Sequence, residues 1–411
     1  MLTGLFADER GEIFDAPEWG AVGVSGGTKR ACEKADMIPL PDSSELMFLP
    51  ARTAVGFRQG AIKNLGRNKF AVAATLPVGF TRLLMPAYEK QPGAPMLPLF
   101  GYAAVAWSRG KLWVAAMRSD ETDKWDPALY NGKDLRRRIT VVRKALPDNR
   151  LVEHLAHCST AWHCCTAQNL FYHRWEAGIP TSPVCNANCL GCISLQPSEC
   201  CPSPQSRITF SPTTAEVAAV AVYHLASAPE PIISFGQGCE GEPSLAADTI
   251  AAAIEETRRQ TSHGILNINT NAGYTEGIRQ IVDAGIDSLR VSLISAREST
   301  HQAYYRSTYT LADVRASIRY AKQKQRHVSV NMLLFPGVND SPAEIAAWRE
   351  FLQDTGVDMI QLRNLNMDPD ELRSALPDFS AAGIGIPAMV RQLQEALPAL
   401  QFGSFSHFRK N

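Results

Sequence analysis

The sequence Ser182-Pro183-Val184-Cys185-Asn186-Ala187-Asn188-Cys189-Leu190-Gly191-Cys192 places three cysteines within eight residues, in the spacing CxxxCxxC. Three thiols on one short loop wrap a compact metal centre more easily than they form disulfides. Structural zinc sites usually take their ligands from two CxxC-like pairs that lie a dozen or more residues apart. A single loop with three thiolates instead suits three corners of a cubane iron-sulfur cluster, whose fourth iron stays open. The loop therefore predicts an iron-sulfur centre held by Cys185, Cys189 and Cys192.

This spacing, followed by repeating strand-helix units, resembles the radical S-adenosylmethionine (radical SAM) superfamily. The resemblance implies that the three cysteines hold a 4Fe-4S cluster, whose open iron is chelated by the amino and carboxylate groups of SAM. It also implies reductive cleavage of SAM to a 5′-deoxyadenosyl radical, which abstracts a hydrogen atom from a substrate that the sequence does not identify. An electron donor such as ferredoxin or flavodoxin is the partner implied. Members often have an aromatic residue directly before the third cysteine, where this chain has Gly191.

Length, composition and charge point to a globular enzyme. The 411 residues are enough for two domains, or for one barrel with an extension. Lys plus Arg and Asp plus Glu both total 41, so no net charge steers the protein toward nucleic acid or an anionic membrane. The best basic patch is Leu135–Arg138 with Arg143 and Lys144, and such runs are usually solvated faces. The balanced charge therefore disfavours a nucleic-acid partner without excluding one.

The N-terminal residues do not read as a secretory signal. Met1–Arg10 lacks the basic start and the long apolar run of a secretory signal. No window of the chain approaches the roughly 20 apolar residues that cross a bilayer. We expect a cytoplasmic protein with no membrane partner, so its ten cysteines favour metal or redox roles over a disulfide framework.

Residues 1–150 are rich in Gly, Pro and short apolar runs, and they predict a smaller, mostly β N-terminal domain that caps a barrel or binds substrate. Residues 101–107 and 111–117 read as a β-hairpin, and 71–76 and 81–85 as further strands. Ala21–Lys29 lacks the full spacing of a phosphate-binding loop, which favours a flexible surface turn.

Residues 151–180 predict a helical linker rich in Cys and His. Helical patterns run from Asp134 to Ala145 and from Leu151 to Tyr172. Two interpretations of the cysteines stay open. A second metal site, an auxiliary cluster or a zinc site, would draw on the following cysteines: Cys158, Cys164, Cys165, Cys200 and Cys201. Buried free cysteines in a packing helix are the alternative, which is favoured because the spacings match no defined metal motif.

Residues 181–370 predict the catalytic core, and 371–411 a C-terminal helix and tail. Apolar strands alternate with amphipathic helices, so the predicted fold class is α/β with a parallel sheet. The resemblance implies a partial (β/α)6 TIM-like barrel. The predicted strands are a first one near Thr181–Val184, then Pro231–Phe235, Ile265–Thr270, Ser288–Ile294, His327–Phe335 and Val357–Leu362. The clearest helices are Thr213–Ala226, Leu245–Gln260, Leu311–Gln325 and Pro342–Thr355.

The C-terminal ends of these strands carry the candidate cofactor contacts, because functional groups gather there in parallel barrels. Glu240-Gly241-Glu242-Pro243 is similar to the family's GGEP loop, and Asn269-Thr270-Asn271 to its TNG ending. The candidate contacts to SAM are Gly241, Glu242, Asn271, Arg290, Ser292, Asn331 and Gly337. Beyond the cluster, the candidate catalytic residues are Cys239, Tyr304 and Tyr305, for which ordinary packing is the alternative.

Two other functions stay open at this point. A non-enzymatic iron-sulfur electron carrier or redox sensor would use the same fold and bind a cluster without turning over SAM. A zinc-stabilised RNA-binding module would need a basic face, which the balanced charge disfavours.

Overall fold

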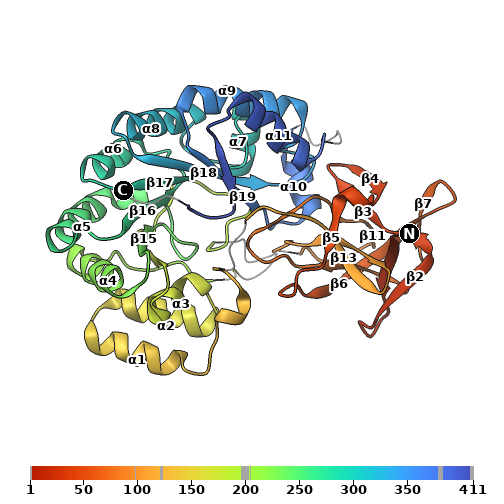
Figure 1. Cartoon of the computed structure of the whole chain (residues 1–411), viewed down its shortest axis with the longest axis horizontal. Helices are drawn as coiled ribbons and strands as arrows, with labels where there is room; N and C mark the ends of the chain where they lie inside the picture. Colours follow the sequence, from red (N-terminus) through yellow and green to blue (C-terminus); the bar gives the residue numbers. More distant parts are fainter. Residues whose placement is uncertain are drawn as a thin grey trace.

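The computed structural model describes residues 2–97, 99–120, 124–195, 203, 205–377 and 383–407. It contains a β-rich N-terminal part and a larger α/β part, which lie side by side in Figure 1. The mixed α/β class and the mostly β N-terminal region are confirmed.

The N-terminal part is built from antiparallel strands. A ten-stranded sheet has the order β11-β6-β2-β1-β8-β12-β13-β5, with β7 paired to β6 and β9 to β13, and a second sheet has the order β10-β3-β4. The strands are β1 (Thr3–Ala7), β2 (Ile13–Gly20), β3 (Val22–Ser25), β4 (Thr28–Ala31), β5 (Met37–Pro39), β6 (Leu46–Arg58), β7 (Ala61–Asn64), β8 (Phe70–Ala74), β9 (Phe80–Arg82), β10 (Met85–Pro86), β11 (Tyr88–Lys90), β12 (Ala103–Ser108) and β13 (Lys111–Arg118). Two 3-10 helices, η1 (Lys34–Asp36) and η2 (Pro127–Leu129), complete it.

Two hairpins test the interpretation of this region. The β12–β13 hairpin is confirmed, with Trp107 opposite Leu112. The prediction of a flexible surface turn at Ala21–Lys29 was wrong, because β3 and β4 form a regular hairpin there whose first arm is largely buried. Its turn reaches the α/β part, where Gly26 N donates to Pro336 O at 2.8 Å. The absence of a phosphate-loop motif could not distinguish a surface turn from a packed hairpin.

Three helices join the two parts: α1 (Leu135–Ala145), α2 (Arg150–Ala161) and α3 (Cys165–Tyr172). The helical pattern of residues 151–172 is therefore two helices, separated near His163, whose backbone is left-handed with φ 51°. The Asn149 side chain caps α2 by accepting from Leu151 N and Val152 N. The break turns α3 back, so that it packs on both α2 and the first parallel strand.

The α/β part holds a seven-stranded parallel sheet in sequential order. Its strands are β14 (Glu176–Ile179), β15 (Ile232–Phe235), β16 (Ile265–Thr270), β17 (Ser288–Leu293), β18 (His327–Leu334), β19 (Met359–Asn364) and β20 (Gln401–Gly403). Sequential order with a helix between strands is the TIM-barrel-like arrangement. Within the described residues, no pairing joins β14 to β20, so the sheet has two edges.

The helices of this part are α4 (Thr214–Ser227), α5 (Ala247–Gln260), α6 (Thr275–Asp283), α7 (Glu298–Tyr305), α8 (Leu311–Gln323), α9 (Pro342–Thr355), α10 (Pro369–Ala375) and α11 (Ile386–Ala396), with the 3-10 helix η3 (Pro243–Ala246). Local sequence sets their ends. Thr213 and Glu216 form a capping box at α4. Ser341 caps α9, whose first residue is Pro342, and Gly356 ends it with φ 67°.

Two features of the sheet differ from the prediction. The first strand was predicted near Thr181–Val184, and this was wrong, because β14 lies at Glu176–Ile179. The amides of Thr181 and Ser182 donate to the side chain of Glu240 and not to a strand. A seventh strand, β20, was not predicted, since three residues give too little periodicity to detect.

The two faces of the parallel sheet differ in polarity. Alternate residues such as Leu289 and Val291 point toward the helices and belong to the main apolar core. The intervening residues are mostly polar and lie in register across the strands. They are Glu176, Ser234, Asn267, Asn269, Ser288, Arg290, Ser292, Ser329, Asn331, Gln361 and Arg363.

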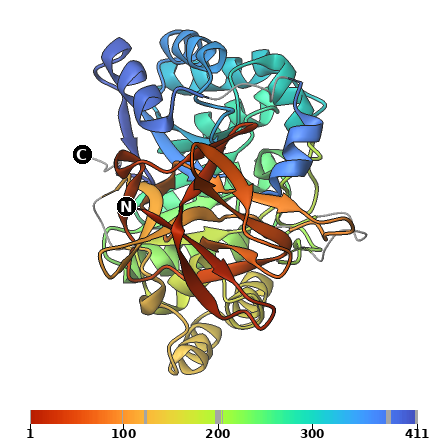
Figure 2. The same cartoon turned by 90° about the vertical axis from the view of Figure 1, so that its right-hand side faces the viewer.

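The N-terminal part packs on the exits of β18 and β19, and its strands lie in front of the parallel sheet in Figure 2. Arg52 forms a fully buried ion pair with Asp368 at 3.1 Å. Arg82 Nη2 donates to Leu365 O at 2.9 Å, and its amide donates to the Asn364 side chain. These contacts fix the β-rich part against the strand ends. No helix among the described residues has the length and apolarity to cross a membrane.

Candidate functional site

The loop with Cys185, Cys189 and Cys192 follows β14, and all three thiols are free and partly buried. One side of the loop rests on α7. Asn188 N donates to Tyr305 O at 2.9 Å, and Leu190 N donates to Tyr304 O at 3.0 Å. Backbone bonds on alternate loop residues hold it in one conformation. The three cysteines, which are close in sequence, therefore lie on a single loop that is fixed against α7.

The other side of the loop rests on the turn after β15. Gly241 N donates to Ser182 O at 2.7 Å, and Glu242 N donates to Val184 O at 2.8 Å. A Cβ on Gly241 would lie 1.9 Å from Val184 O, so only glycine permits this contact. The predicted role of Gly241 was contact with a cofactor, and the structure shows close backbone contact with the loop.

Glu240 ties the same turn to the start of the loop. Its Oε2 accepts from Thr181 N at 2.7 Å and Ser182 N at 2.9 Å, and its Oε1 accepts from Gln237 N at 2.7 Å. Burial raises the pKa of Glu240 to about 7, although these backbone donors lower it. In the sequence analysis, Glu240 was only the first residue of the segment that is similar to the GGEP loop, and no role was predicted for it. A buried carboxylate with three backbone donors is instead a positioning residue for the loop.

Glu242 and Asn271 join β15 and β16 to the loop. Glu242 accepts from the Thr270 hydroxyl, from Ser244 N at 3.0 Å and from Asn271 N at 2.8 Å. Burial raises the pKa of Glu242, and these donors lower it. Asn271 Nδ2 donates to the Asn186 side chain of the loop at 2.7 Å. The two predicted cofactor residues thus lie side by side next to the cysteine loop.

The cysteine loop fits a cluster better than a single ion. Among the described residues, its thiols are not one of the groups whose ligand atoms lie within 4.8 Å of one another. A four-iron cubane is larger than one ion and needs its thiolates further apart. Arg207 Nη2 lies 3.7 Å from Cys192 Sγ, and Ser194 Oγ lies 3.6 Å from it. Such donors to a sulfur are typical of iron-sulfur sites, where they adjust the cluster potential.

Charge repulsion disfavours three bare thiolates here. Burial raises the pKa of Cys185 and of Cys189, and for Cys189 the neighbouring Cys185 and Cys192 raise it further. A bound cation removes this penalty, because it favours the deprotonated form of its ligands. The chemistry of the loop therefore matches a metal centre.

Tyr304 and Tyr305, predicted as candidate catalytic residues, are buried in α7 beneath the loop. Tyr304 Oη lies 2.8 Å from the position that a Cβ on Gly191 would occupy. Tyr305 Oη donates to Ser292 O at 2.8 Å, which joins α7 to the end of β17. His301 packs against Tyr305, with 4.6 Å between the ring centroids and the rings tilted by 37°. These contacts give both tyrosines a packing role.

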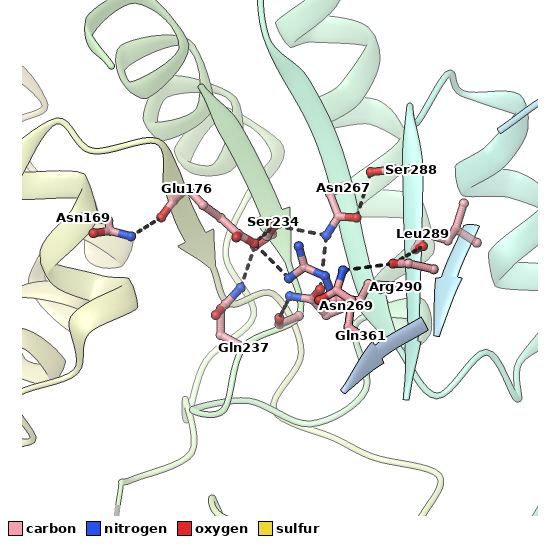
Figure 3. Close-up of polar contacts among 12 residues, drawn as sticks. Asn169, Glu176, Ser234, Gln237, Asn267, Asn269, Ser288, Leu289, Arg290 and Gln361 are labelled. Carbon is pink, nitrogen blue, oxygen red and sulfur yellow. Dashed lines mark hydrogen bonds and ion pairs between the residues drawn. The ribbon is translucent and has the colours of Figure 1, made fainter. Parts of the chain in front are cut away.

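The polar face of the sheet carries a network centred on Glu176 and Arg290 (Figure 3). Arg290 Nη1 donates to Glu176 Oε1 at 3.0 Å, and Ser234 Oγ donates to the same oxygen at 2.6 Å. Asn267 Nδ2 donates to Ser234 Oγ at 3.0 Å. Although burial raises it, the charge of Arg290 holds the pKa of Glu176 below its ordinary value. Arg290 was predicted to contact a cofactor, and its partner in the structure is Glu176.

A cavity of about 460 Å³ lies at this polar face. Its charged lining residues are Glu176, Arg290 and Arg363, and its polar lining includes Gln237 and Thr166. The β-rich part contributes Leu76–Val78. Within the described ranges, no carboxylate forms an ion pair with Arg363, whose Nη2 donates only to Gln361 at 3.3 Å. Burial lowers the pKa of Arg363 to about 10, with repulsion from Arg290 as the next cause.

The sequence missed Glu176, Gln237 and Arg363 as site residues. The sequence did carry one signal for them, because polar residues occur at every second position of the parallel strands. Strands of a parallel sheet that are buried on both faces are usually continuous apolar runs, so this alternation indicates a polar face.

Two predicted cofactor contacts lie elsewhere on the strand ends. Asn331 is in register with Ser292 and Gln361, and its Oδ1 is buried with no partner among the described residues. Gly337 has φ 92°, and a Cβ there would lie 1.9 Å from Gly26 N. Gly337 therefore supports the β3–β4 hairpin.

The remaining cysteines regroup in the structure. Cys158 Sγ lies 3.5 Å from His154 Nε2, and these two atoms and Cys239 Sγ all lie within 4.8 Å of one another. Cys164 lies at the start of α3, and Cys165 lines the cavity. Cys200 and Cys201 lie outside the described residues. Of the five cysteines predicted for a second metal site, Cys158 thus lies beside Cys239, which was predicted as a candidate catalytic residue.

Residues 179–348 match the family model of the Radical SAM superfamily. No curated protein matches the chain. Similar solved structures include methylornithine synthase, with 13% identity over 64% of this chain and 72% of that chain and a TM-score of 0.37. A radical SAM methyltransferase from Sphaerobacter thermophilus has 17% identity over 57% of this chain and 65% of that one, with a TM-score of 0.37. SuiB of Streptococcus suis bound to S-adenosylmethionine has 12% identity over 62% of this chain and 52% of that one, with a TM-score of 0.38.

Proposed function

We infer that the chain, whose residues 179–348 match the Radical SAM superfamily, is an enzyme of that superfamily. On this premise we propose that it cleaves SAM reductively at a 4Fe-4S cluster held by Cys185, Cys189 and Cys192. When bound and reduced, such a cluster supplies one electron to the sulfonium of SAM, which gives methionine and a 5′-deoxyadenosyl radical that takes a hydrogen atom from the substrate. The parallel sheet from β14 to β20 forms the family's partial barrel in this proposal, so its core extends beyond the predicted residues 181–370 at both ends.

One observation carries this proposal: the cysteine loop is held on one side by the turn after β15 and on the other by α7. The turn after β15 binds the start of the loop through Glu240, Gly241 and Glu242. On the opposite side, α7 binds its middle. A loop fixed to this degree keeps its three thiolates in one geometry before any cluster binds, which lowers the cost of binding.

SAM lies at the ends of β15 to β17 in this proposal, close to Gly241, Asn271 and Ser292. The support is that Asn271 contacts the cysteine loop directly and that Ser292 is joined to α7 by Tyr305. Glu242 positions Asn271 by accepting from its amide. Asn331 offers an unpaired buried oxygen as a further contact. Arg290, which is paired with Glu176, belongs to the substrate cavity instead.

The substrate is proposed to be a small molecule with an anionic group that binds Arg363. The cavity of about 460 Å³ is within the usual range for small-molecule sites, about 300–1,000 Å³. Its three charged lining residues are one carboxylate and two guanidiniums, and Glu176 already pairs with Arg290. Arg363 is left as a half-buried cation, which is unfavourable unless an anion pairs with it. Gln237 connects this cavity to the turn that holds the cysteine loop.

The β-rich domain, residues 1–150, is proposed to cap the barrel. It packs on the exits of β18 and β19, and Leu76–Val78 line the cavity. Such a cover excludes water from a reactive intermediate.

The electron donor is proposed to be ferredoxin or flavodoxin. The apolar side chains of Val184, Ile193 and Leu195 around the cysteine loop are exposed, at 57%, 38% and 57%. Exposed apolar side chains grouped around one loop suit a docking partner.

SAM cleavage is tested by anaerobic reconstitution with iron and sulfide, followed by incubation with SAM and dithionite. The wild type is expected to form 5′-deoxyadenosine and to bind about four irons per chain. The triple variant Cys185→Ala, Cys189→Ala, Cys192→Ala is expected to lose both, while Cys32→Ala in the β-rich part keeps both. A wild type that binds iron but forms no more 5′-deoxyadenosine than the triple variant would support an electron carrier.

Anion binding is tested with thermal unfolding in inorganic phosphate and in malonate. We expect either anion to raise the Tm of the wild type by a few degrees and to have a much smaller effect on Arg363→Gln. Arg349→Gln, at an exposed position of α9, is the control and should respond as the wild type does. An equal rise in Tm in Arg363→Gln and Arg349→Gln, or no rise in the wild type, would reject the anionic substrate. Neither outcome would affect the proposal that the protein cleaves SAM.

A further inference from the structure

A second thiol group lies outside the cysteine loop and is assembled from distant parts of the chain. His154 and Cys158 are four residues apart on α2, so they share one face of the helix. Their Nε2 and Sγ atoms are 3.5 Å apart. Cys239 reaches the same point from the turn after β15, where Ile208 N fixes its backbone by donating to Cys239 O at 2.7 Å.

The three ligand atoms form a compact, buried set. All of them lie within 4.8 Å of one another, and among the described residues no other three Cys, His, Asp or Glu ligands do so. Cys158 is 1% exposed and Cys239 is 4% exposed. Two thiols and an imidazole so close together suit one ion and are too close for a cluster of several irons.

A fourth donor is next to this set. Cys164 is the residue immediately before α3, and its amide donates to Cys158 O at 3.1 Å. This bond holds the backbone of Cys164 against the residue that carries one of the two buried thiols. Three thiolates and one imidazole are a common donor set of structural zinc sites.

We propose that His154, Cys158 and Cys239 bind one Zn²⁺ ion, with Cys164 as the fourth ligand. Soft thiolates with an imidazole favour zinc over magnesium, calcium or manganese, which prefer oxygen ligands. This site shares no ligand with the cluster loop and does not depend on the function proposed above.

The zinc site has a positioning role because of where Cys239 lies. The next three residues are Glu240, Gly241 and Glu242, which hold the cysteine loop. An ion that joins Cys239 to α2 therefore fixes one end of the turn on which the loop depends. Zinc coordination joins α2 to the turn after β15 more rigidly than a few hydrogen bonds would.

The site is tested by the zinc content of purified protein and by cobalt substitution. We expect about one zinc per chain in the wild type, and at least a tenfold lower content in Cys158→Ser and Cys239→Ser. Cobalt in the wild type should show a thiolate-to-cobalt charge-transfer band with the intense visible bands of tetrahedral coordination. The controls are Cys32→Ser and the triple Cys185, Cys189, Cys192→Ala variant, which should both keep their zinc.

Three outcomes would overturn the proposal. They are a wild type without zinc after growth in zinc-supplemented medium, zinc retained by both single variants, or bound cobalt without the thiolate band. If neither cysteine variant folds, His154→Asn decides, because His154 is only half-buried and its loss leaves the core intact. That variant should bind zinc at least as much more weakly as the loss of an outer-shell partner causes, about 10–100-fold. Unchanged affinity would exclude His154 as a ligand.

Discussion

The two cysteine groups of this protein are built in opposite ways. Cys185, Cys189 and Cys192 are close in sequence and half-buried, and their three sulfur atoms are not all within 4.8 Å of one another. Cys158 and Cys239 are 81 positions apart in the numbering, fully buried, and within 4.8 Å of each other at the sulfur. A short loop leaves room for a cluster with an open position, whereas ligands from separate elements enclose one ion. Spacing along the chain thus reveals the first kind of site and hides the second.

The turn after β15 connects the two groups. Cys239 belongs to the proposed zinc site, and the next three residues bind the start of the cysteine loop. Substitutions in this turn therefore test whether iron binding by the cysteine loop and zinc binding by the second group can be lost separately.

The largest effect is expected from Gly241→Ala. The new Cβ would lie 1.9 Å from Val184 O, and a backbone carbonyl has no rotamer that relieves the overlap. The loop has to move, at a cost of about 1–3 kcal/mol. We expect iron binding to weaken about tenfold or more, since 1.4 kcal/mol is a factor of ten. Zinc content should stay unchanged, because Gly241 contacts no proposed zinc ligand. Iron and zinc are measured per chain after anaerobic reconstitution.

Gly20→Ala is the matched control for Gly241→Ala. A Cβ on Gly20 meets its nearest neighbours at 3.5 Å, which is ordinary contact. Both metals should remain bound in this variant. Normal iron binding in Gly241→Ala would show that the loop does not depend on the turn, and equal loss of iron and zinc would show that the two groups are one cooperative unit.

Local patterns predicted most of the fold. β16 and α9 begin and end where the sequence placed them, because polar caps and apolar runs coincide with their ends. β14 was placed five residues too late, since Thr181–Val184 has strand-like composition but its amides bind Glu240. The role of Glu240 depends on a partner 59 residues away, which one sequence does not reveal.

The candidate site was predictable only in its local part. The three loop cysteines stand out by spacing, whereas His154 and Cys239 gain meaning only when α2 meets the β15 turn. Likewise, Arg290 looked available for a cofactor until β14 placed Glu176 beside it. Contacts between neighbouring strands of a parallel sheet join residues separated by a whole helix, so periodicity identifies the face and not the pair.

The smallest and most local effect concerns the packing of the cysteine loop on α7, away from the proposed zinc site. In Gly191→Ala the new Cβ would lie 2.8 Å from Tyr304 Oη, while its other neighbours are Leu365 Cδ1 at 3.5 Å and Tyr304 Cζ at 3.7 Å. Only the hydroxyl is too close, so Tyr304→Phe should restore the fit. We expect Gly191→Ala to cost roughly 1 kcal/mol of unfolding free energy in the wild type and much less beside Tyr304→Phe. Urea unfolding of the wild type, the two single variants and the double variant measures the coupling free energy between Gly191 and Tyr304. As a control, the cost of Gly191→Ala is also measured in a Tyr320→Phe background, because Tyr320 is distant from the loop. An equal cost in all backgrounds would mean that the loop adjusts without Tyr304, and that the α7 contact, unlike the β15 turn, does not set the geometry of the three thiols.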